Sequence, residues 1–165
     1  MEFVIREVSV DDAQSLLDYA ARLFSECLPG LWRRPVPSFE EECAFIASYD
    51  APNSSLVVAE LNGRILGLAG LLGKSLEQES HVGSVGISVD RDYRGSGIGT
   101  RLLEQLITWA PAHRITRIEI EAFANNPRAI ALYEHLGFER EGVRRGGVVV
   151  DGEYVDVICL GRSPG

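Results

Sequence analysis

The chain has 165 residues and a formal net charge of −8, with 45% apolar and 24% charged residues. This length and composition predict one globular domain over residues 1–165, and no apolar run approaches the roughly 18 residues of a membrane-spanning helix. The acidic balance argues against nucleic acid as a partner, because phosphate contacts supply much of that affinity, and is compatible with a cationic small molecule.

The chain also lacks the features of an exported or metal-binding protein. Its first residues, MEFVIREVSVDD, have neither a basic head nor an apolar core, so we expect a cytoplasmic protein without a membrane contact. Cys27, Cys43 and Cys159 are scattered and odd in number, which argues against a disulfide framework and favours a reducing compartment. The three histidines share no ligand spacing with one another or with the cysteines, so no metal site is predicted.

The first half of the chain predicts a strand, two helices and a hairpin. Residues 3–10 form the strand, and apolar side chains at helical spacing predict a helix over 12–27. Three prolines, a glycine and a tryptophan in residues 28–39 predict a surface loop, and a short helix follows around 39–49. Two apolar runs on either side of Asn-Gly then predict a β-hairpin, because a type I′ turn needs positive φ at both central residues.

The second half predicts strand, helix, strand, helix and hairpin. Residues 81–89 form a glycine-rich strand, where glycine marks a bulge or a close approach by another group. A helix over 97–110, a strand over 114–123 and a helix over 126–137 follow, and the hairpin at 142–160 turns at Asp-Gly. This order of elements predicts a mixed sheet with helices on its faces, not a doubly wound parallel fold.

The turn before the helix at 97–110 holds three glycines in five residues, Gly95, Gly97 and Gly99. A Walker phosphate loop needs Lys-Ser/Thr after its last glycine, and Thr100 stands there instead. A Rossmann dinucleotide fingerprint needs G-x-G-x-x-G, and this run is one residue short, although Glu119 lies at a suitable distance downstream to bind a ribose.

A pyrophosphate-binding turn at a helix start is the third interpretation of these glycines. The N–H groups of residues 95–100 would face an anion, and the helix adds about half a positive charge at that end. Arg94 would add a charge-assisted contact. A tight turn without a ligand is the alternative.

Two motifs resemble those of one enzyme family. Residues 94–99, RGSGIG, resemble the R/Q-x-x-G-x-G/A signature of the GCN5-related N-acetyltransferases (GNAT family), and residues 125–138, NNPRAIALYEHLGF, are similar to its N-x-x-A-x-x-L-Y-x-x-x-G-F element. The order of predicted elements also fits over nearly the whole chain. The resemblance implies an α/β fold with a mostly antiparallel central sheet of about seven strands. It further implies a cleft where the fourth and fifth strands splay apart, and about four flanking helices.

The resemblance implies acetyl-CoA as co-substrate, without a metal. Its pyrophosphate would lie on residues 94–100, and the backbone of the glycine-rich strand would pair with the pantetheine amides like an added strand. Asn126 would cap the following helix and also reach the cofactor. The implied cofactor-binding residues are Ile87, Val89, Arg94, Gly95, Ser96, Gly97, Ile98, Gly99, Thr100 and Asn126.

The resemblance also implies that Tyr133 is the general acid for the departing thiolate. A phenol of pKa about 10 is protonated at neutral pH, although a core tyrosine is the other interpretation. Many relatives place a glutamate on the glycine-rich strand, but the equivalent residue here is Ser84. We therefore expect Glu119 to be the base, because its strand borders the cleft. The alternatives are Glu79, His81 and Glu121.

The acceptor is expected to bind near residues 28–39 and the last hairpin. Trp32, Arg33 and Arg34 are its predicted contacts, since an arginine can hold a carboxylate, with plain loop surface as the alternative. The segments SHVGSVGISVD and GEYVD look like those of bacterial relatives that acetylate the α-amine of free amino acids. Polyamines, aminoglycosides, protein N-termini and a non-catalytic coenzyme A-binding role stay open. Family members are often dimers, and the apolar C-terminal hairpin is a suitable interface for a homodimer.

Overall fold

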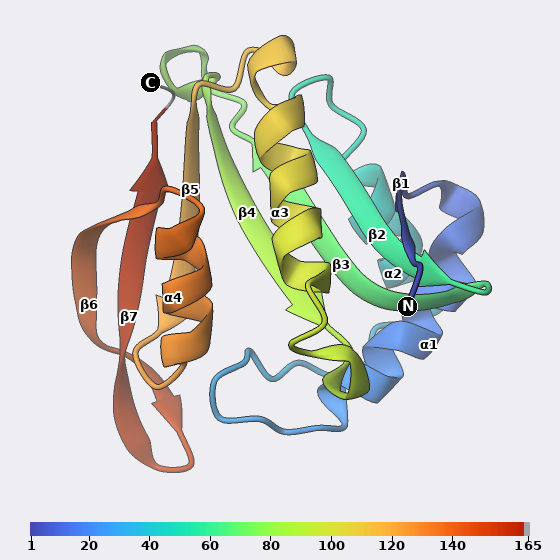
Figure 1. Ribbon diagram of the computed structural model, residues 1–165, viewed down its shortest axis with the longest axis horizontal. Coiled ribbons are helices and arrows are strands. Elements are labelled where there is room, and N and C mark those ends of the chain that lie inside the picture. Colours follow the sequence, from blue (N-terminus) through green and yellow to red (C-terminus); the bar gives the residue numbers. More distant parts are fainter. Residues whose placement is uncertain (164–165) are drawn as a thin grey trace.

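The computed structural model describes residues 1–163 as one sheet with helices on both faces (Figure 1). The strand order is β1-β2-β3-β4-β5-β7-β6, and all neighbours are antiparallel except β4 and β5, which run parallel. The strands are β1 (Val4–Glu7), β2 (Ser55–Leu61), β3 (Arg64–Gly73), β4 (Val82–Val89), β5 (Arg117–Phe123), β6 (Glu139–Val150) and β7 (Glu153–Arg162). The α-helices in this part of the chain are α1 (Ala13–Phe24), α2 (Phe39–Ala47), α3 (Ile98–Trp109) and α4 (Pro127–His135). The predicted fold class is confirmed.

Apolar stripes decide which face of the sheet each helix covers. On the face toward the viewer in Figure 1, Leu102 and Leu106 of α3 share a buried cluster with Leu66 of β3 and Ile130 of α4. Each such side chain stabilises the fold by roughly 1.5–3 kcal/mol on burial. The helices α1 and α2 cover the opposite face. The buried members of this second core are Ala13, Leu16, Tyr19, Ile46, Leu56, Val58 and Ile65.

Both predicted hairpins have the expected turn. Asn62 and Gly63, between β2 and β3, have φ of 50° and 79°, and Asp151 and Gly152, between β6 and β7, have φ of 50° and 83°. Positive φ at both central residues is the requirement of a type I′ turn, which matches the twist of the strands that it joins. The short-range turn chemistry therefore sets the pairing next to each turn, and both ladders shift register farther along, at Ala59/Glu60 and between Arg144 and Val148.

The predicted helices are present, with shorter ends. The helix expected over 12–27 is α1, which ends at Phe24, and the helix expected over 39–49 is α2, which ends at Ala47. Residues 25–38, called the α1–α2 loop below, have no regular helix or strand. No helix within residues 1–163 combines the length and the hydropathy needed to cross a membrane.

The parallel pairing of β4 and β5 stops halfway along both strands. It runs from Val82 opposite Arg117 to Val85 opposite Ile120, whereas β4 continues to Val89 and β5 to Phe123. Beyond the last pair the two strands diverge, as Figure 1 shows, toward the end where the α1–α2 loop lies. We call this opening, between residues 86–89 and residues 121–123, the splay. This opening is the cleft between the fourth and fifth strands that the family resemblance implied. It positions the site described next.

Candidate active site

The unpaired half of β4 turns main-chain groups into the splay. The N–H of Asp90 donates to the carbonyl of Leu66 in β3 at 2.7 Å, so Asp90, and by alternation Ser88, direct their backbone groups to β3. Ile87 and Val89 therefore direct theirs to the other side, where β5 has moved away. An extended amide-bearing chain can add to this edge as a strand would. This is the arrangement expected for Ile87 and Val89.

The splay leads to the start of α3, where two glycines adopt left-handed backbone conformations. Gly95 has φ of 80°, and Gly97, the N-cap residue, has φ of 86°. A Cβ on Gly97 would meet no atom within 4 Å, and no side chain caps the helix. The first N–H groups of the helix, those of Ile98, Gly99 and Thr100, therefore have no helical acceptor and face open space. Such a helix start is suited to an anion.

Arg94 and Ser96, both expected to contact the cofactor, make contacts within the protein. The guanidinium of Arg94 donates to the carboxylate of Glu26 at 2.7 Å and to the carbonyl of Val89 at 3.0 Å, and Ser96 donates to the carbonyl of Tyr93. These bonds tie the turn to the end of α1 and to β4. Arg94 thus holds the shape of the turn, in contrast to the anion contact that we expected of its side chain.

Sequence reasoning missed a second arginine beside this turn. Nη2 of Arg128, on α4, lies 2.6 Å from the position that a Cβ on Gly95 would take. The guanidinium thus lies against the turn, while the positive φ of 80° is what favours glycine at position 95. The signal in the sequence is that Arg128 lies inside the NNPRA motif at the start of α4.

Asn126 and Tyr133 lie at the two ends of α4. The Asn126 side chain accepts a hydrogen bond from the N–H of Ala129 at 3.2 Å, so the capping role holds, and its amide donates to the carbonyl of Gly30 at 3.3 Å. Tyr133 is 6% exposed, and burial raises its pKa to about 12. A phenol with this pKa keeps its proton at neutral pH, as a general acid requires.

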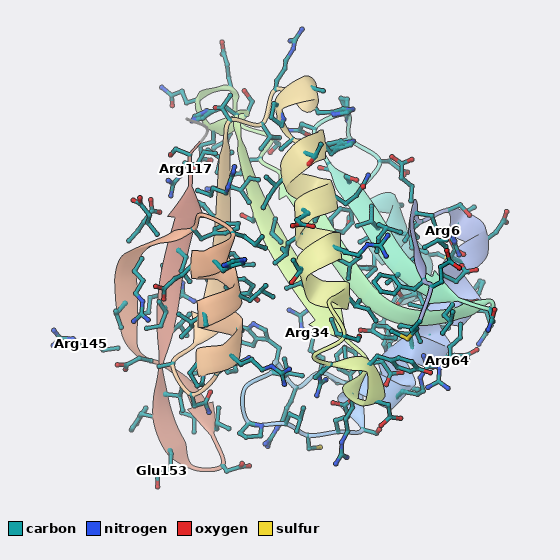
Figure 2. The ribbon with its side chains drawn as sticks, viewed as in Figure 1. Arg6, Arg34, Arg64, Arg117, Arg145 and Glu153 are labelled. Carbon is teal, nitrogen blue, oxygen red and sulfur yellow. The ribbon has the colours of Figure 1, made fainter. Side chains whose placement is uncertain are left out.

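Glu119, the expected base, lies outside the splay. It pairs with Ser84 where β4 and β5 still form a ladder, and its carboxylate contacts Lys74 at 3.5 Å and Arg117 at 3.4 Å. Figure 2 shows Arg117 at the end of the sheet opposite to the end where Arg34 lies. Glu119 therefore precedes the part of β5 that borders the opening, which begins after Ile120.

The alternatives to Glu119 are also engaged elsewhere. Glu121, the next carboxylate along β5, accepts a hydrogen bond from Arg144 at 2.8 Å, and this bond lowers the pKa of the Glu121 carboxyl. Glu79 lies 3.4 Å from Lys74, before β4 begins, and His81 is likewise on the closed side of the sheet. Glu121 borders the splay but is bound by Arg144, and Glu79 and His81 precede β4 on the closed side, so none of the three is both free and beside the opening.

A cavity of about 450 Å³ lies on the α1–α2 face of the sheet, next to the splay. Its floor includes Gly86, Ile87 and Ser88 of β4, and the three expected acceptor contacts, Trp32, Arg33 and Arg34, all line it. Most of its wall is apolar, with Leu16, Leu23, Phe24, Leu31, Phe45 and Leu68 among the contributors. The cavity therefore suits a ligand that combines an apolar part with a few charged groups.

The α1–α2 loop lines this cavity and also reaches the C-terminal half of the chain. The ring of Trp32 packs edge-on against Phe123 of β5 at 4.9 Å. Arg33 forms an ion pair of 2.8 Å with Asp151 in the β6–β7 turn. The amide of Asn125 donates to a loop carbonyl at 3.1 Å. The loop thus spans the open end of the splay.

One carboxyl group inside the cavity escaped the sequence analysis. Glu42 of α2 is 6% exposed and lines the cavity, and burial raises the pKa of its carboxyl. Its side chain accepts none of the hydrogen bonds formed within residues 1–163, whereas its neighbour Glu41 caps α2 by accepting from the N–H of Ser38 at 2.7 Å. The available signal was helical spacing, because Glu42 lies one turn before the buried Ile46.

Most of the chain matches the model of one protein family. Residues 17–138 match the model of the acetyltransferase (GNAT) family. The chain belongs to the GNAT family. The match covers the glycine turn at the start of α3 and the whole of α4, which carry the two motifs that suggested the family. GNAT proteins are N-acetyltransferases, so the chain is an acetyltransferase of this family.

Two curated relatives cover almost the whole chain. The L-amino acid N-acetyltransferase AaaT of Escherichia coli is 29% identical over 98% of this chain and 98% of its own length. The N-alpha-acetyltransferase RimI of Mycobacterium tuberculosis is 35% identical over 93% of this chain and 88% of its own length. These GNAT relatives are named for different acceptors.

Solved GNAT structures have the same fold. A GNAT acetyltransferase from Streptococcus pneumoniae superposes with a TM-score of 0.92 and 28% identity, over 99% of this chain and 100% of its own. The structure of yncA, a putative acetyltransferase from Salmonella typhimurium with its cofactor acetyl-CoA, has a TM-score of 0.87 and 18% identity. It matches over 99% of this chain and 94% of its own. At 18% identity this second likeness concerns the fold alone.

Proposed function

We propose that the protein transfers the acetyl group of acetyl-CoA to the α-amine of a free amino acid, by direct attack of the amine in a ternary complex. The observation that carries the proposal is the open main-chain edge of β4, which leads directly to the uncapped start of α3. On one side of this edge the chain can hold a long, amide-bearing diphosphate. On the other side it has a cavity of about 450 Å³ for a small acceptor.

The donor half of the site follows from backbone geometry. The pantetheine amides pair with Ile87 and Val89 along the splay, and the pyrophosphate lies on the N–H groups of residues 95–100 with Arg128 above it. The N–H of Val89 is the proposed donor to the thioester oxygen as that oxygen gains charge. Tyr133 donates its phenolic proton to the departing thiolate. A solved structure of the same fold contains acetyl-CoA, which supports this choice of donor.

The acceptor half favours a small molecule with a carboxylate. The α1–α2 loop forms one wall of the cavity, and its Trp32 and Arg33 contact β5 and the β6–β7 turn. Arg34 lines the cavity and is a suitable partner for the carboxylate of an amino acid. The relative that is named an L-amino acid N-acetyltransferase supports this acceptor class.

A protein N-terminal α-amine is the second candidate acceptor. It is favoured by the relative that is named an N-alpha-acetyltransferase. The α1–α2 loop lines the cavity and is bonded to the C-terminal half of the chain through Arg33 and Asn125, which limits the room for a long peptide. We therefore rank the free amino acid first.

The test is thiol release from acetyl-CoA with a panel of acceptors. The panel contains the free L-amino acids, short peptides with free N-termini, polyamines and aminoglycosides. We expect release that depends on a free amino acid and that is lost when its α-amine is blocked. Binding of acetyl-CoA without release in the presence of any amine would leave only a coenzyme A-binding role. Faster release with peptides than with amino acids would establish the second candidate instead.

A further inference from the structure

Glu42 is a buried carboxyl that no hydrogen bond or ion pair within residues 1–163 neutralises. Its oxygens accept no hydrogen bond from residues 1–163, yet no side-chain oxygen in this part of the chain is both fully buried and unpaired. The carboxylate oxygens therefore keep some exposed surface, and the cavity that Glu42 lines is the space beside them. An ionised carboxylate in this position is largely removed from bulk water and has no ion-pair partner within residues 1–163, which costs free energy that a cationic ligand would return.

The other ionisable groups of the cavity do not compensate Glu42. Burial is the cause of its raised pKa, so no neighbouring cation holds the carboxyl in its charged form. Glu41 is used in the cap of α2, and Arg33 pairs with Asp151. Burial also raises the pKa of Tyr19 and Tyr49, so neither is charged near neutral pH. The titratable or charged side chains around the cavity are Tyr19, Cys27, Arg33, Arg34, Glu41, Glu42 and Tyr49.

The cavity connects this carboxyl to the place where the acetyl group must lie. Its floor is the stretch Gly86–Ser88, which is also the edge of the splay where β4 has lost its pairing with β5. Glycine at position 86 adds no side chain, and no atom lies within 4 Å of where its Cβ would be. The wall that carries Glu42 and the edge that would hold the thioester thus enclose one space.

We propose that Glu42 binds the ammonium group of the acceptor and removes one proton from it before attack. The inference rests on the proposed function, because it assigns the base of that reaction. Glu119 and Glu121 are bound by arginine or lysine side chains, whereas Glu42 is free to take a new cation.

The step balances in protons and bonds. One proton passes from the ammonium group to Glu42, and the neutral nitrogen forms a C–N bond with the thioester carbon as the C–S bond breaks. The thiolate takes the phenolic proton of Tyr133. The second nitrogen proton goes to water, from which Tyr133 is reprotonated, and Glu42 releases its proton to water. The sum is ammonium plus acetyl-CoA giving amide, free thiol and one proton.

The test compares the pH dependence of kcat/KM in the wild-type enzyme and in Glu42→Gln, using the best acceptor of the panel. In the wild type we expect a bell-shaped profile, limited at low pH by ionisation of Glu42 and at high pH by the amine itself. The variant can use only amine that is already neutral. Its kcat/KM should rise tenfold per pH unit up to the pKa of the amine. The loss should be about 10²-fold or more at pH 6.5 and should shrink to a few-fold above the pKa of the amine.

Two further variants separate this role from a structural one. Glu40→Gln makes the same chemical change on an exposed residue in the first turn of the same helix, and should leave the profile unchanged. Glu42→Asp keeps the carboxyl and should keep the bell shape at a lower height. A loss in Glu42→Gln that is equal at all pH values, or no loss, in a protein whose wild type is active would overturn the role of Glu42 alone. A wild-type protein that releases no thiol with any amine would overturn the proposed function, and this inference with it.

Discussion

At the scale of single residues, two acids in the site are shifted in the same direction for the same reason. Burial disfavours the anion, so it raises the pKa of Tyr133 to about 12 and raises the pKa of the Glu42 carboxyl. The consequences differ because the ordinary pKa of a phenol is about 10, whereas that of a glutamate carboxyl is about 4.5. Tyr133 keeps a proton to give to the thiolate, whereas Glu42 becomes a better proton acceptor from an ammonium group.

Removal of the Tyr133 hydroxyl tests the proposed acid. We expect Tyr133→Phe to lower kcat by about 10²-fold or more, because the thiolate must then leave without a proton. The affinity for acetyl-CoA and the melting temperature should change little, since the ring still packs in the core. Steady-state kinetics and calorimetric titration measure both effects, with Tyr154→Phe, an 81% exposed tyrosine, as the control. Unchanged kcat in Tyr133→Phe would remove the acid from the mechanism.

Glu42 should also leave a mark on the stability of the ligand-free protein. Its pKa is raised on folding above the ordinary 4.5, so the folded state holds this proton more tightly than the unfolded state. The wild type therefore loses stability as the pH rises from about 4.5 through the folded pKa. Glu42→Gln removes that loss, and its stability relative to the wild type should increase between pH 4 and pH 7. Urea unfolding at pH 4 and pH 7 measures the difference in free energy of unfolding between the variant and the wild type. An equal difference at both pH values would contradict the raised pKa of Glu42.

At the scale of elements, the start of α3 depends on backbone conformation more than on side chains. Gly95 and Gly97 both have positive φ, and the space above Gly97 is open. A side chain at position 97 would strain the turn and would also occupy the space in front of the first N–H groups of the helix. The strain can be separated from the loss of space in front of the N–H groups, because Gly63 also has positive φ but does not lie at the start of a helix.

The separation uses Gly97→Ala and Gly63→Ala as a pair. Gly63, in the β2–β3 turn, has φ of 79°, and no atom lies within 4 Å of an added Cβ. Gly97 shares both features, with φ of 86°. Each variant should lose about 1–2 kcal/mol of stability, the cost of a left-handed conformation for an L-residue. Only Gly97→Ala should also lose affinity for acetyl-CoA, by about tenfold or more in calorimetric titration. Equal affinities in the two variants would show that the pyrophosphate does not lie on this turn.

The elements themselves were largely predictable from the sequence, because their signals are local. Asn62-Gly63 and Asp151-Gly152 dictate their turns by φ, and the spacing of Leu102 and Leu106 dictates the buried face of α3. The base was not predictable in this way. Glu119 looked suitable because its strand borders the cleft, but the point at which β4 and β5 separate is set by the packing of the whole sheet.

The same limit applies to the side chains around the site. Arg94 was expected at the anion, and nothing local predicts that Glu26, at a sequence separation of 68 residues, binds its guanidinium. Burial of Glu42 depends on how α2 packs against α1 and the sheet, and three consecutive glutamates in the sequence do not show which one turns inward. Long-range packing decided each of these cases.

At the scale of the whole molecule, the α1–α2 loop joins the two halves of the sheet across the splay. Trp32 reaches Phe123 of β5, and Arg33 reaches Asp151 in the β6–β7 turn. These contacts lie on the acceptor side of the site, whereas the donor side is built from β4, α3 and α4. The binding of the acceptor and the binding of acetyl-CoA should therefore respond to different substitutions.

Arg33→Ala tests this division. Loss of the ion pair to Asp151 should loosen the loop and raise KM for the acceptor several-fold, with KM for acetyl-CoA and the melting temperature almost unchanged. The exposed pair is screened by water, so we expect no measurable effect on stability. Arg140→Ala, which removes another exposed ion pair, to Glu134, is the control. A parallel rise of both KM values would show that the loop serves the two substrates together.

The central claim is that the open edge of β4 and the start of α3 form a binding site for acetyl-CoA. A crystal structure of the protein with coenzyme A tests it most directly. The account predicts pantetheine amides hydrogen-bonded to the backbone of Ile87 and Val89, and pyrophosphate oxygens within about 3 Å of N–H groups from residues 95–100. Coenzyme A bound elsewhere on the molecule, with the splay empty, would contradict it.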